Sequence, residues 1–408
     1  MTATDPRAAL HALAAIERGS AGPGEERAAE LIAGLLGEHG LEAWLEREPA
    51  VGGFWQSTGL AAAAGALAGA IGLRGGSPRR RAAALALSAA AAGAMADDVD
   101  GGRHHLRWLL RKRSATNVLA WAGDPAARET VVIVAHHDAA HTGLLFHPGL
   151  VPALARRFPD WYARQNTSVQ TGRLLVAGPL LVALGNLLGV RAARALGTVW
   201  SAVTALLLAD VARSPVVCGA NDNLSAVAVL LDLARRLENR PVAGVRVLLL
   251  STGSEESFME GMRGFVARHR AELDPDTTRV IALECVGSPH LMLMEGEGML
   301  LMRDHDAGLR EEIQRAADRV GIGLWRGLRL GAGATDALPA LRAGYRTACL
   351  AACDEYKTPA NYHWPSDVPE NLDWNTIDAA GDVLDSLLRG LGAEEEPSGE
   401  ASTAVARS

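Results

Sequence analysis

Short apolar runs that alternate with amphipathic helical patterns restrict the fold of this chain more than any other feature. The runs ETVVIVAHHD, GVRVLLLS, TRVIALECVGS and YRTACLAAC are almost continuously apolar, which is typical of strands buried on both faces. Between them, stretches such as DNLSAVAVLLDLARRLENR carry apolar residues at helical spacing. Strands that alternate with helices predict an α/β protein, a three-layer α/β/α sandwich around a largely parallel mixed sheet.

The two ends of the chain extend this plan. Residues 5–47 are predicted to form two helices, with Gly40 ending the second. The pattern SATNVLAWAG predicts a further strand, and TIDAAGDVLDSLLRGLG predicts a closing helix. We therefore expect a single domain over residues 1–392. The polar segment AEEEPSGEASTAVARS predicts a disordered tail over residues 393–408.

Two apolar segments, at about 54–98 and 172–211, interrupt the alternation. Each contains a pair of uncharged stretches separated by arginines, namely residues 49–73 with 82–96, and 174–190 with 195–209. Each pair predicts a helical hairpin with an arginine-bearing tip. A bilayer crossing needs about 20 apolar residues, so only the first stretch is comfortably long. A soluble helical cap and a membrane anchor are both open, and we favour membrane association because the surface would otherwise be very apolar.

The predicted location follows from the charges around these hairpins. A hairpin has two legs, so residues before and after each insertion lie on the same side and can build one site. Arginines at the hairpin tips would place the tips in the cytoplasm. The segment HHLRWLLRKR, with His104 and His105, predicts a basic interfacial patch on the body side and argues the reverse. The start MTATDPRAAL shows no secretory signal. We expect a membrane-associated protein whose body is cytoplasmic, with a soluble cytoplasmic protein as the alternative.

Composition excludes some partners. The formal net charge is -7 and the pI is near 6.0, so the chain has no basic footprint and nucleic acid is not an expected partner. The four cysteines, Cys218, Cys285, Cys349 and Cys353, show no paired-ligand spacing. They are predicted to be free thiols.

Metal-type ligands occur at five places, at the ends of predicted strands or in the loops that follow. They are His136 with Asp138 in VVIVAHHDAAHTG, Asp222 in VCGANDNLS, Glu255 with Glu256 in LLLSTGSEES, Glu284 in IALECVG, and His363 in PANYHWPSD. Each has an ordinary explanation, such as a surface loop or a helix cap. A carboxylate that ends an apolar strand, however, is costly unless it is paired or binds a metal. All five places in this order predict a metal centre.

This series of motifs resembles the two-zinc exopeptidase family of bacterial leucyl aminopeptidases and glutamate carboxypeptidase II, the zinc aminopeptidase-like metallopeptidases. Glutaminyl cyclases are more distant members. The likeness runs from about Asp5 to Gly392 and leaves out the two hairpins and the tail. The family site combines His-x-Asp, Gly-Ala-x-Asp-Asn-x-Ser-Gly, Glu-Glu, an Asp or Glu after a strand, and a late His. The resemblance implies that residues 1–392 form a catalytic domain.

The resemblance also implies two co-catalytic Zn²⁺ ions. It assigns His136 and Glu284 to one zinc, Glu256 and His363 to the other, and Asp222 to the position that bridges them. Three carboxylates neutralise two Zn²⁺ only partly. The remaining positive charge can polarise a peptide carbonyl and lower the pKa of water toward about 7.

The resemblance assigns further roles beside the metal ligands. Glu256, as a ligand, cannot also accept a proton, so its neighbour Glu255 is the expected general base. Asp138 would steady the ring of His136. Tyr362 is a candidate donor to the tetrahedral oxyanion, with plain packing as the alternative. Asp336, in GAGATDALPALRAGYR, stands where the family usually has an Asp, and no role is assigned to it.

Three positions depart from the family pattern. Ala226 and Phe258 stand where glycine is common, and Glu284 stands where many members have Asp. The first two concern the shape of the pocket more than metal binding.

The expected function is that of a zinc-dependent exopeptidase, most simply an aminopeptidase that cleaves small peptides through a metal-activated water. An amidohydrolase or deacylase on N-acyl compounds is the alternative within enzymes, and a non-catalytic membrane scaffold is the alternative outside them. A cyclase-like site with one zinc is disfavoured, because His136 would then have no metal to bind.

Overall fold

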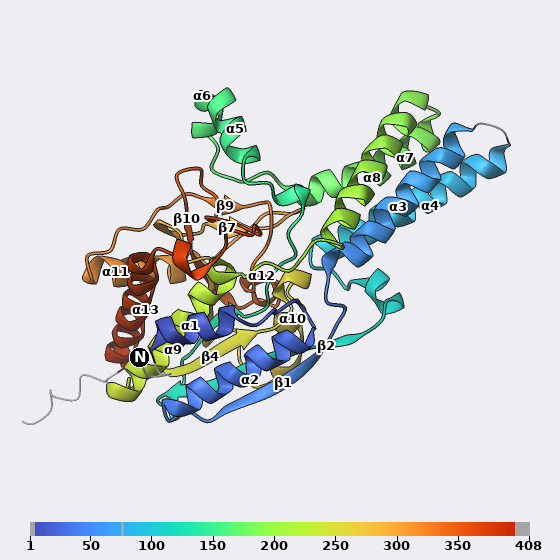
Figure 1. Cartoon of the computed structure of the whole chain (residues 1–408). Helices are drawn as coiled ribbons and strands as arrows, with labels where there is room; N and C mark the ends of the chain where they lie inside the picture. The colour runs from blue at the N-terminus through green and yellow to red at the C-terminus, as the bar shows by residue number, and fades with distance from the viewer. Residues whose placement is uncertain (1–4, 75–76, 396–408) are drawn as a thin grey trace, which may run out of the picture.

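A seven-stranded mixed sheet forms the centre of the computed structural model, which describes residues 5–74 and 77–395 (Figure 1). The strand order is β1-β2-β4-β3-β5-β10-β6. The central strands β4, β3, β5 and β10 are parallel, and β1, β2 and β6 add antiparallel strands at the edges. The strands are β1 (Ala43–Ala50), β2 (Arg113–Gly123), β3 (Thr130–His136), β4 (Arg246–Thr252), β5 (Thr278–Glu284), β6 (His290–Leu293) and β10 (Arg346–Cys353).

Helices cover both faces of this sheet, so the predicted α/β/α sandwich is confirmed. Successive residues of β3 point to opposite faces: Val131 and Ile133 join one apolar core, and Val132 and Val134 join the other. The first core is closed by α1 (Pro6–Ala14), α2 (Pro23–Glu38), α9 (Ser225–Asn239), α11 (Ala307–Arg319) and α13 (Trp374–Glu395). The second is closed by α10 (Glu260–His269) and α12 (Ala337–Arg342).

Several elements differ from the sequence prediction. The prediction of only two helices over residues 5–47 is incomplete, because β1 begins at Ala43 and pairs with β2 as an edge strand. Its sequence AWLEREPA mixes charged and apolar residues, as an edge strand with one solvated face does. The closing helix α13 continues through Glu395, so the prediction of a disordered tail is wrong for residues 393–395. The rest of that tail, 396–408, lies outside the described residues.

Smaller elements complete the body. They are the three-stranded sheet of β7 (Gly296–Glu297), β8 (Arg303–Asp304) and β9 (Arg329–Leu330), the short helices α5 (Leu150–Arg157) and α6 (Pro159–Ala163), and one-turn segments at His105–Leu109, Leu144–Phe146, Ala220–Leu224, Glu255–Ser257 and Pro369–Asn371. The last four of these one-turn segments lie in loops that lead to or from the central strands and helices.

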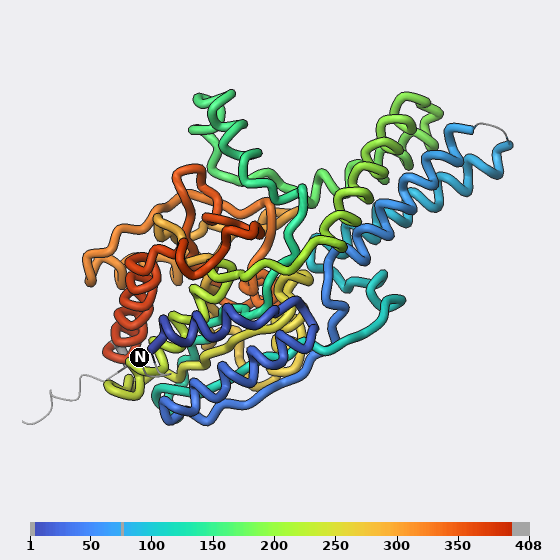
Figure 2. The backbone as a smooth tube through the Cα atoms, in the orientation of Figure 1, coloured from blue at the N-terminus to red at the C-terminus, as the bar shows by residue number. Residues whose placement is uncertain are grey.

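Two helical hairpins leave the body on one side (Figures 1 and 2). The first consists of α3 (Phe54–Leu73) and α4 (Pro78–Val99), and the second of α7 (Thr171–Leu188) and α8 (Arg191–Val211). Helix α3 packs on α8 and α4 packs on α7, so the hairpins form one four-helix bundle. All four helices are long and apolar enough to cross a membrane.

Candidate metal centre

Five predicted ligands converge at the carboxyl edge of the parallel strands, where open α/β sheets commonly bind ligands. His136 and Glu284 are the last residues of β3 and β5. Glu256 lies in the one-turn segment after β4, and His363 lies in the loop after β10. Asp222 lies in the turn that leads into α9. These side chains come from segments far apart in the sequence and meet in one nearly buried cluster.

Asp222 lies between the two histidines. Its Oδ1 atom is 3.2 Å from His136 Nε2, and its Oδ2 atom is 3.1 Å from His363 Nε2. Glu284 Oε1 is 3.6 Å from His136 Nε2, and Glu256 Oε2 is 3.2 Å from His363 Nε2. The side chains therefore form two groups of three that share Asp222, and the ligand atoms within each group lie within 4.8 Å of one another.

These residues fit zinc. Among the described residues, His136 Nε2, His363 Nε2 and Glu256 Oε1 are buried but make no hydrogen bond. A buried polar atom without a partner costs about 1–3 kcal/mol, so three such atoms at one point suit a bound cation. Imidazole nitrogen and carboxylate oxygen are donors that zinc uses.

The electrostatics of the cluster also favour cations. Burial raises the pKa of Glu256 and of Glu284 to about 7. Burial lowers the pKa of the two histidines, but the neighbouring carboxylates have the larger effect. They raise the pKa of His363 to about 10 and the pKa of His136 well above its ordinary value. Burial likewise opposes charge on Asp222, but the close contacts with the two histidine rings lower its pKa. The carboxylates thus draw positive charge into a site that is closed to most solvent.

Glu255 lies outside the two groups of three around Asp222, but it forms a third such group with His136 and Glu256. Its Oε2 atom is 3.8 Å from His136 Nε2. Burial, followed by the nearby carboxylates of Glu256, Glu284 and Asp336, raises the pKa of Glu255 well above its ordinary value. Asp336 accepts a hydrogen bond from Thr252 Oγ1, and burial raises the pKa of Asp336 to about 6.

Asp138 holds two loops of the site together. Its Oδ1 atom is 3.4 Å from His136 Nδ1, the side that faces away from Asp222. The same carboxylate accepts hydrogen bonds from the backbone N–H groups of Glu255 (3.0 Å) and Glu256 (3.2 Å), and from Ser20 Oγ (2.6 Å). Asp138 therefore contacts the ring of one predicted ligand and the backbone of another. The bonds to the glutamate backbone were not predicted.

A family comparison agrees with this geometry. The model of peptidase family M28 matches residues 202–388, which include Asp222, Glu255, Glu256, Glu284 and His363. The match supports a zinc aminopeptidase-like metallopeptidase family for this chain. His136 and Asp138 precede the matched region. None of the curated proteins matches the sequence.

Solved structures show that this chain has the zinc-exopeptidase fold. A Zn-dependent exopeptidase from Parabacteroides distasonis ATCC 8503 is 13% identical, with a TM-score of 0.52 over 95% of this chain and 98% of that one. The zinc aminopeptidase BSAP from Bacillus subtilis is 14% identical, with a TM-score of 0.53 over 95% of this chain and 94% of that one. A glutaminyl cyclase from Porphyromonas gingivalis is 12% identical, with a TM-score of 0.51 over 95% and 98%. At these identities the similarity establishes the fold alone.

Two polar residues that the sequence reasoning missed hold the predicted ligands in place. Asp367 accepts hydrogen bonds from the backbone N–H groups of Asn221 (2.6 Å) and Asp222 (3.2 Å). Asn223 bonds through its amide to the backbone of both residues that flank Glu284. The asparagines on either side of Asp222 in GANDN could have indicated this role, whereas nothing local marks Asp367.

Phe258 explains one departure from the family pattern. It stands where family members commonly have glycine, and its φ of 62° is in the left-handed region that glycine prefers. The ring stacks on Phe54 of α3 at 5.4 Å, and the Arg107 guanidinium lies 5.3 Å from its centroid. The side chain thus packs on the inserted hairpin. Ala226 is fully buried within α9.

Tyr362 lies over the cluster. Its ring is stacked on that of His363 with centroids 3.8 Å apart, and 36% of the residue is exposed. Phe146 packs edge-on against the same histidine at 4.4 Å. These contacts give Tyr362 a packing role, and its role as an oxyanion donor stays a prediction.

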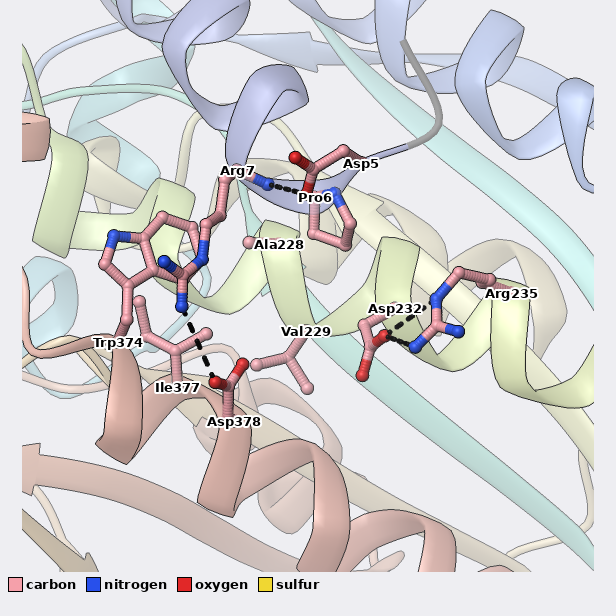
Figure 3. Close-up of a pocket in the computed structure, with 10 residues that line it drawn as sticks. All are labelled: Asp5, Pro6, Arg7, Ala228, Val229, Asp232, Arg235, Trp374, Ile377 and Asp378. Atoms are coloured by element: carbon pink, nitrogen blue, oxygen red, sulfur yellow. Dashed lines mark hydrogen bonds and ion pairs between the residues drawn. The ribbon is translucent and has the colours of Figure 1, made fainter. Parts of the chain in front are cut away.

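A cavity of about 410 Å³ lies elsewhere, between α1, α9 and α13 (Figure 3). Its charged residues pair with one another: Arg7 lies 3.8 Å from Asp378, and Arg235 lies 2.6 Å from Asp232. No residue of the metal cluster lines it, so the chemistry is assigned to the cluster and not to this cavity.

Proposed function

We propose that this chain is a zinc-dependent aminopeptidase that hydrolyses the terminal peptide bond of small peptides. The observation that carries the proposal is the carboxylate of Asp222, whose two oxygens face His136 and His363 at 3.2 and 3.1 Å. A carboxylate placed in this way suits a bridge between two cations. The two groups that share it supply the remaining ligands.

The chain's own residues divide the work. His136 and Glu284 would hold one zinc, Glu256 and His363 the other, with Asp222 common to both. Two zinc ions, once bound, supply the positive charge that polarises a peptide carbonyl and lowers the pKa of water. Glu255 accepts a proton from the attacking water and passes it to the leaving amine.

Burial of the cluster supports action at a chain end. Glu255 and Glu256 are 8% and 9% exposed, and the aromatic rings of Tyr362 and Phe146 crowd His363. A nearly closed site of this kind accepts the end of a peptide more easily than its middle. It also excludes water, which strengthens the electrostatic interactions at the reacting carbonyl.

The alternatives act on different bonds. A deacylase would use the same cluster on N-acyl compounds, and a glutaminyl cyclase would close a terminal glutamine without hydrolysis. The complete group formed by His136, Asp222 and Glu284 supports a second metal position and therefore favours the hydrolases.

A substrate panel tests the proposal. The purified full-length chain would be assayed on aminoacyl anilides, N-acyl amino acids, peptides with a blocked amino terminus and glutaminyl peptides, each with and without chelator. We expect release of the terminal residue from substrates with a free amino group, loss of turnover with chelator, and strongly reduced turnover by Glu255→Gln. Turnover of N-acyl or glutaminyl substrates alone, or activity that resists chelator, would overturn the aminopeptidase assignment.

A further inference from the structure

The interior of the four-helix bundle is made of small residues. The buried face of α3 consists mainly of alanine and glycine spaced three and four apart, including Ala61, Ala62, Gly65, Ala68, Gly69 and Gly72. This spacing puts them on one side of the helix. The buried residues of α8 include Gly197, Ser201 and Thr204, which are also small. The two hairpins therefore meet through small side chains.

These small residues let the helix backbones approach closely. A Cβ atom on Gly69 would lie 1.9 Å from Thr198 Oγ1, and one on Gly197 would lie 2.7 Å from the carbonyl oxygen of Gly178. No larger residue fits at either crossing. Close packing of glycine, alanine, serine and threonine is the way helices associate within a bilayer, where burial of large apolar side chains gains nothing.

The outside of the bundle carries the large apolar side chains. Exposed examples are Leu67 (58%), Leu188 (69%), Val199 (62%), Val203 (49%) and Leu206 (71%). The body of the same molecule shows the opposite distribution, with leucine, valine and isoleucine in its core. A water-soluble helix buries its apolar stripe, so the bundle is built for a different solvent from the body.

Charged residues are confined to the ends of the bundle. The tip carries Arg79, Arg80 and Arg81 on α4, and Arg191 and Arg194 on α8. Arg81 donates to the carbonyls of Asn186 and Leu187, and Arg194 donates to that of Gly72. The tip arginines thus satisfy carbonyls at the ends of α7 and α3, where a helix has no partners of its own.

The helix lengths match a bilayer. The four helices have 20, 22, 18 and 21 residues, which correspond to about 27–33 Å at 1.5 Å per residue. The hydrocarbon core of a bilayer is about 30 Å thick. At the body end, Trp108 (65%) and Leu109 (83%) are exposed next to Arg111 and Lys112, a combination that suits the interface. His104 does not join this patch as expected, because it is buried 3.8 Å from Asp98.

We propose that the bundle of α3, α4, α7 and α8 spans a lipid bilayer, with its glycine- and alanine-rich faces inward and its leucine and valine side chains against lipid. The bundle holds the catalytic body at the membrane surface. Neither the insertion of the bundle nor the placement of the body at the membrane depends on the proposed peptidase activity. A soluble cap whose apolar face is covered by a second copy of the chain is the competing arrangement.

Site-directed spin labelling distinguishes the two. Full-length protein with a nitroxide at Val199→Cys or Val203→Cys would be reconstituted into phosphatidylcholine–phosphatidylglycerol vesicles, with Cys218 replaced by serine. Leu301→Cys is the matched control, because Leu301 is 55% exposed on the body. Collisions with oxygen and with a water-soluble nickel complex would be measured at each label.

We expect oxygen collisions to dominate at positions 199 and 203, and nickel collisions to dominate at 301. The full-length protein should also stay in the membrane pellet after alkaline carbonate washing. Nickel access at 199 and 203 equal to that at 301 would overturn the proposal. So would a protein that is monodisperse without detergent, whether as a monomer or as a dimer that covers the bundle.

Discussion

The adjacent residues Glu255 and Glu256 carry the same side chain but have different surroundings. Glu256 lies 3.2 Å from His363 within a group of three ligands, whereas Glu255 lies outside the two groups that share Asp222. Their backbone N–H groups both donate to Asp138, which holds the backbone of the turn in place. Glu255 also forms a group of three with His136 and Glu256, so the division of roles between the two glutamates is a prediction: Glu256 binds metal and Glu255 transfers the proton.

Substitution of the two glutamates should separate these roles. We expect Glu255→Gln to lower kcat by about 100- to 10,000-fold, because a positioned general base contributes that much, while zinc content stays at the wild-type level. Glu256→Ala should lose zinc as well as activity. The two variants would be compared by turnover and by elemental analysis. Equal loss of zinc in both would contradict the assignment.

Asp138 should control zinc affinity without binding zinc itself. Asp138→Asn weakens the contact to His136 and disturbs two backbone hydrogen bonds to the glutamate loop. We expect zinc affinity to fall by about 10- to 100-fold, the usual effect of removing a partner of a metal-binding histidine. Competition with a chelating dye measures this affinity directly. Unchanged zinc affinity would show that Asp138 serves stability alone.

At the scale of elements, the first hairpin is joined to the glutamate loop by a buried ion-pair network. Arg107, in the one-turn segment after α4, donates to Asp98 at 2.7 Å and lies 2.9 Å from Glu260. It also donates to the backbone carbonyl of Ser257 at 2.7 Å, directly after Glu256. The inserted hairpin therefore supports the loop that carries the proposed base and one zinc ligand.

Removal of Arg107 should destabilise the fold strongly. Arg107→Ala leaves the carboxylates of Asp98 and Glu260 buried without this partner, and breaking a buried pair costs about 3–5 kcal/mol. Arg111→Ala is the matched control, because Arg111 is exposed and should change the free energy of unfolding by less than about 0.5 kcal/mol. Thermal unfolding of both variants in detergent is the measurement. Similar melting temperatures for the two would contradict the network's importance.

At the scale of the whole molecule, the hairpins leave and re-enter the body on the same side, so their insertion does not separate β1 from β2 or His136 from Asp222 (Figure 1). The orientation of the bundle decides where the site faces. Basic residues in short flanking segments favour the cytoplasm. More of the basic residues near the helix ends are exposed on the body side than at the tips. Those on the body side are Arg103, Arg111, Lys112, Arg113, Arg156, Arg157, Arg164, Arg173 and Arg213.

We therefore expect the catalytic body to face the cytoplasm. Green fluorescent protein fused to the carboxyl terminus should fluoresce in cells, and alkaline phosphatase fused at the same point should be inactive. The reverse pair of results would place the body outside. The two fusions control for each other, since both test the same end of the same chain.

The sequence predicts the central sheet and the ligands well, because each signal is local. The apolar runs of β3, β4, β5 and β10 end at the ligand motifs, and parallel strands bring such ends to one edge. The edge strand β1 was missed because its charged residues do not read as a buried strand. The contact from Ser20 to Asp138 spans 118 positions, so no local pattern could reveal it.

The packing between elements could not be predicted from the sequence either. The inward face of α3 and the outward face of α8 are both apolar by composition, and only the structure shows that small residues lie inside and large ones outside. The same holds for Phe258, which departs from the family pattern and packs on Phe54 of the inserted hairpin.

Zinc content is the decisive measurement, because distant segments of this chain are proposed to build a site for two cations. Full-length protein purified in zinc-replete buffer and then freed of loosely bound metal should contain close to two zinc ions per chain by elemental analysis. The Asp222→Ala variant, which lacks the carboxylate common to both groups, should contain far less. A wild-type protein that retains no zinc, or only one ion per chain, would contradict the account.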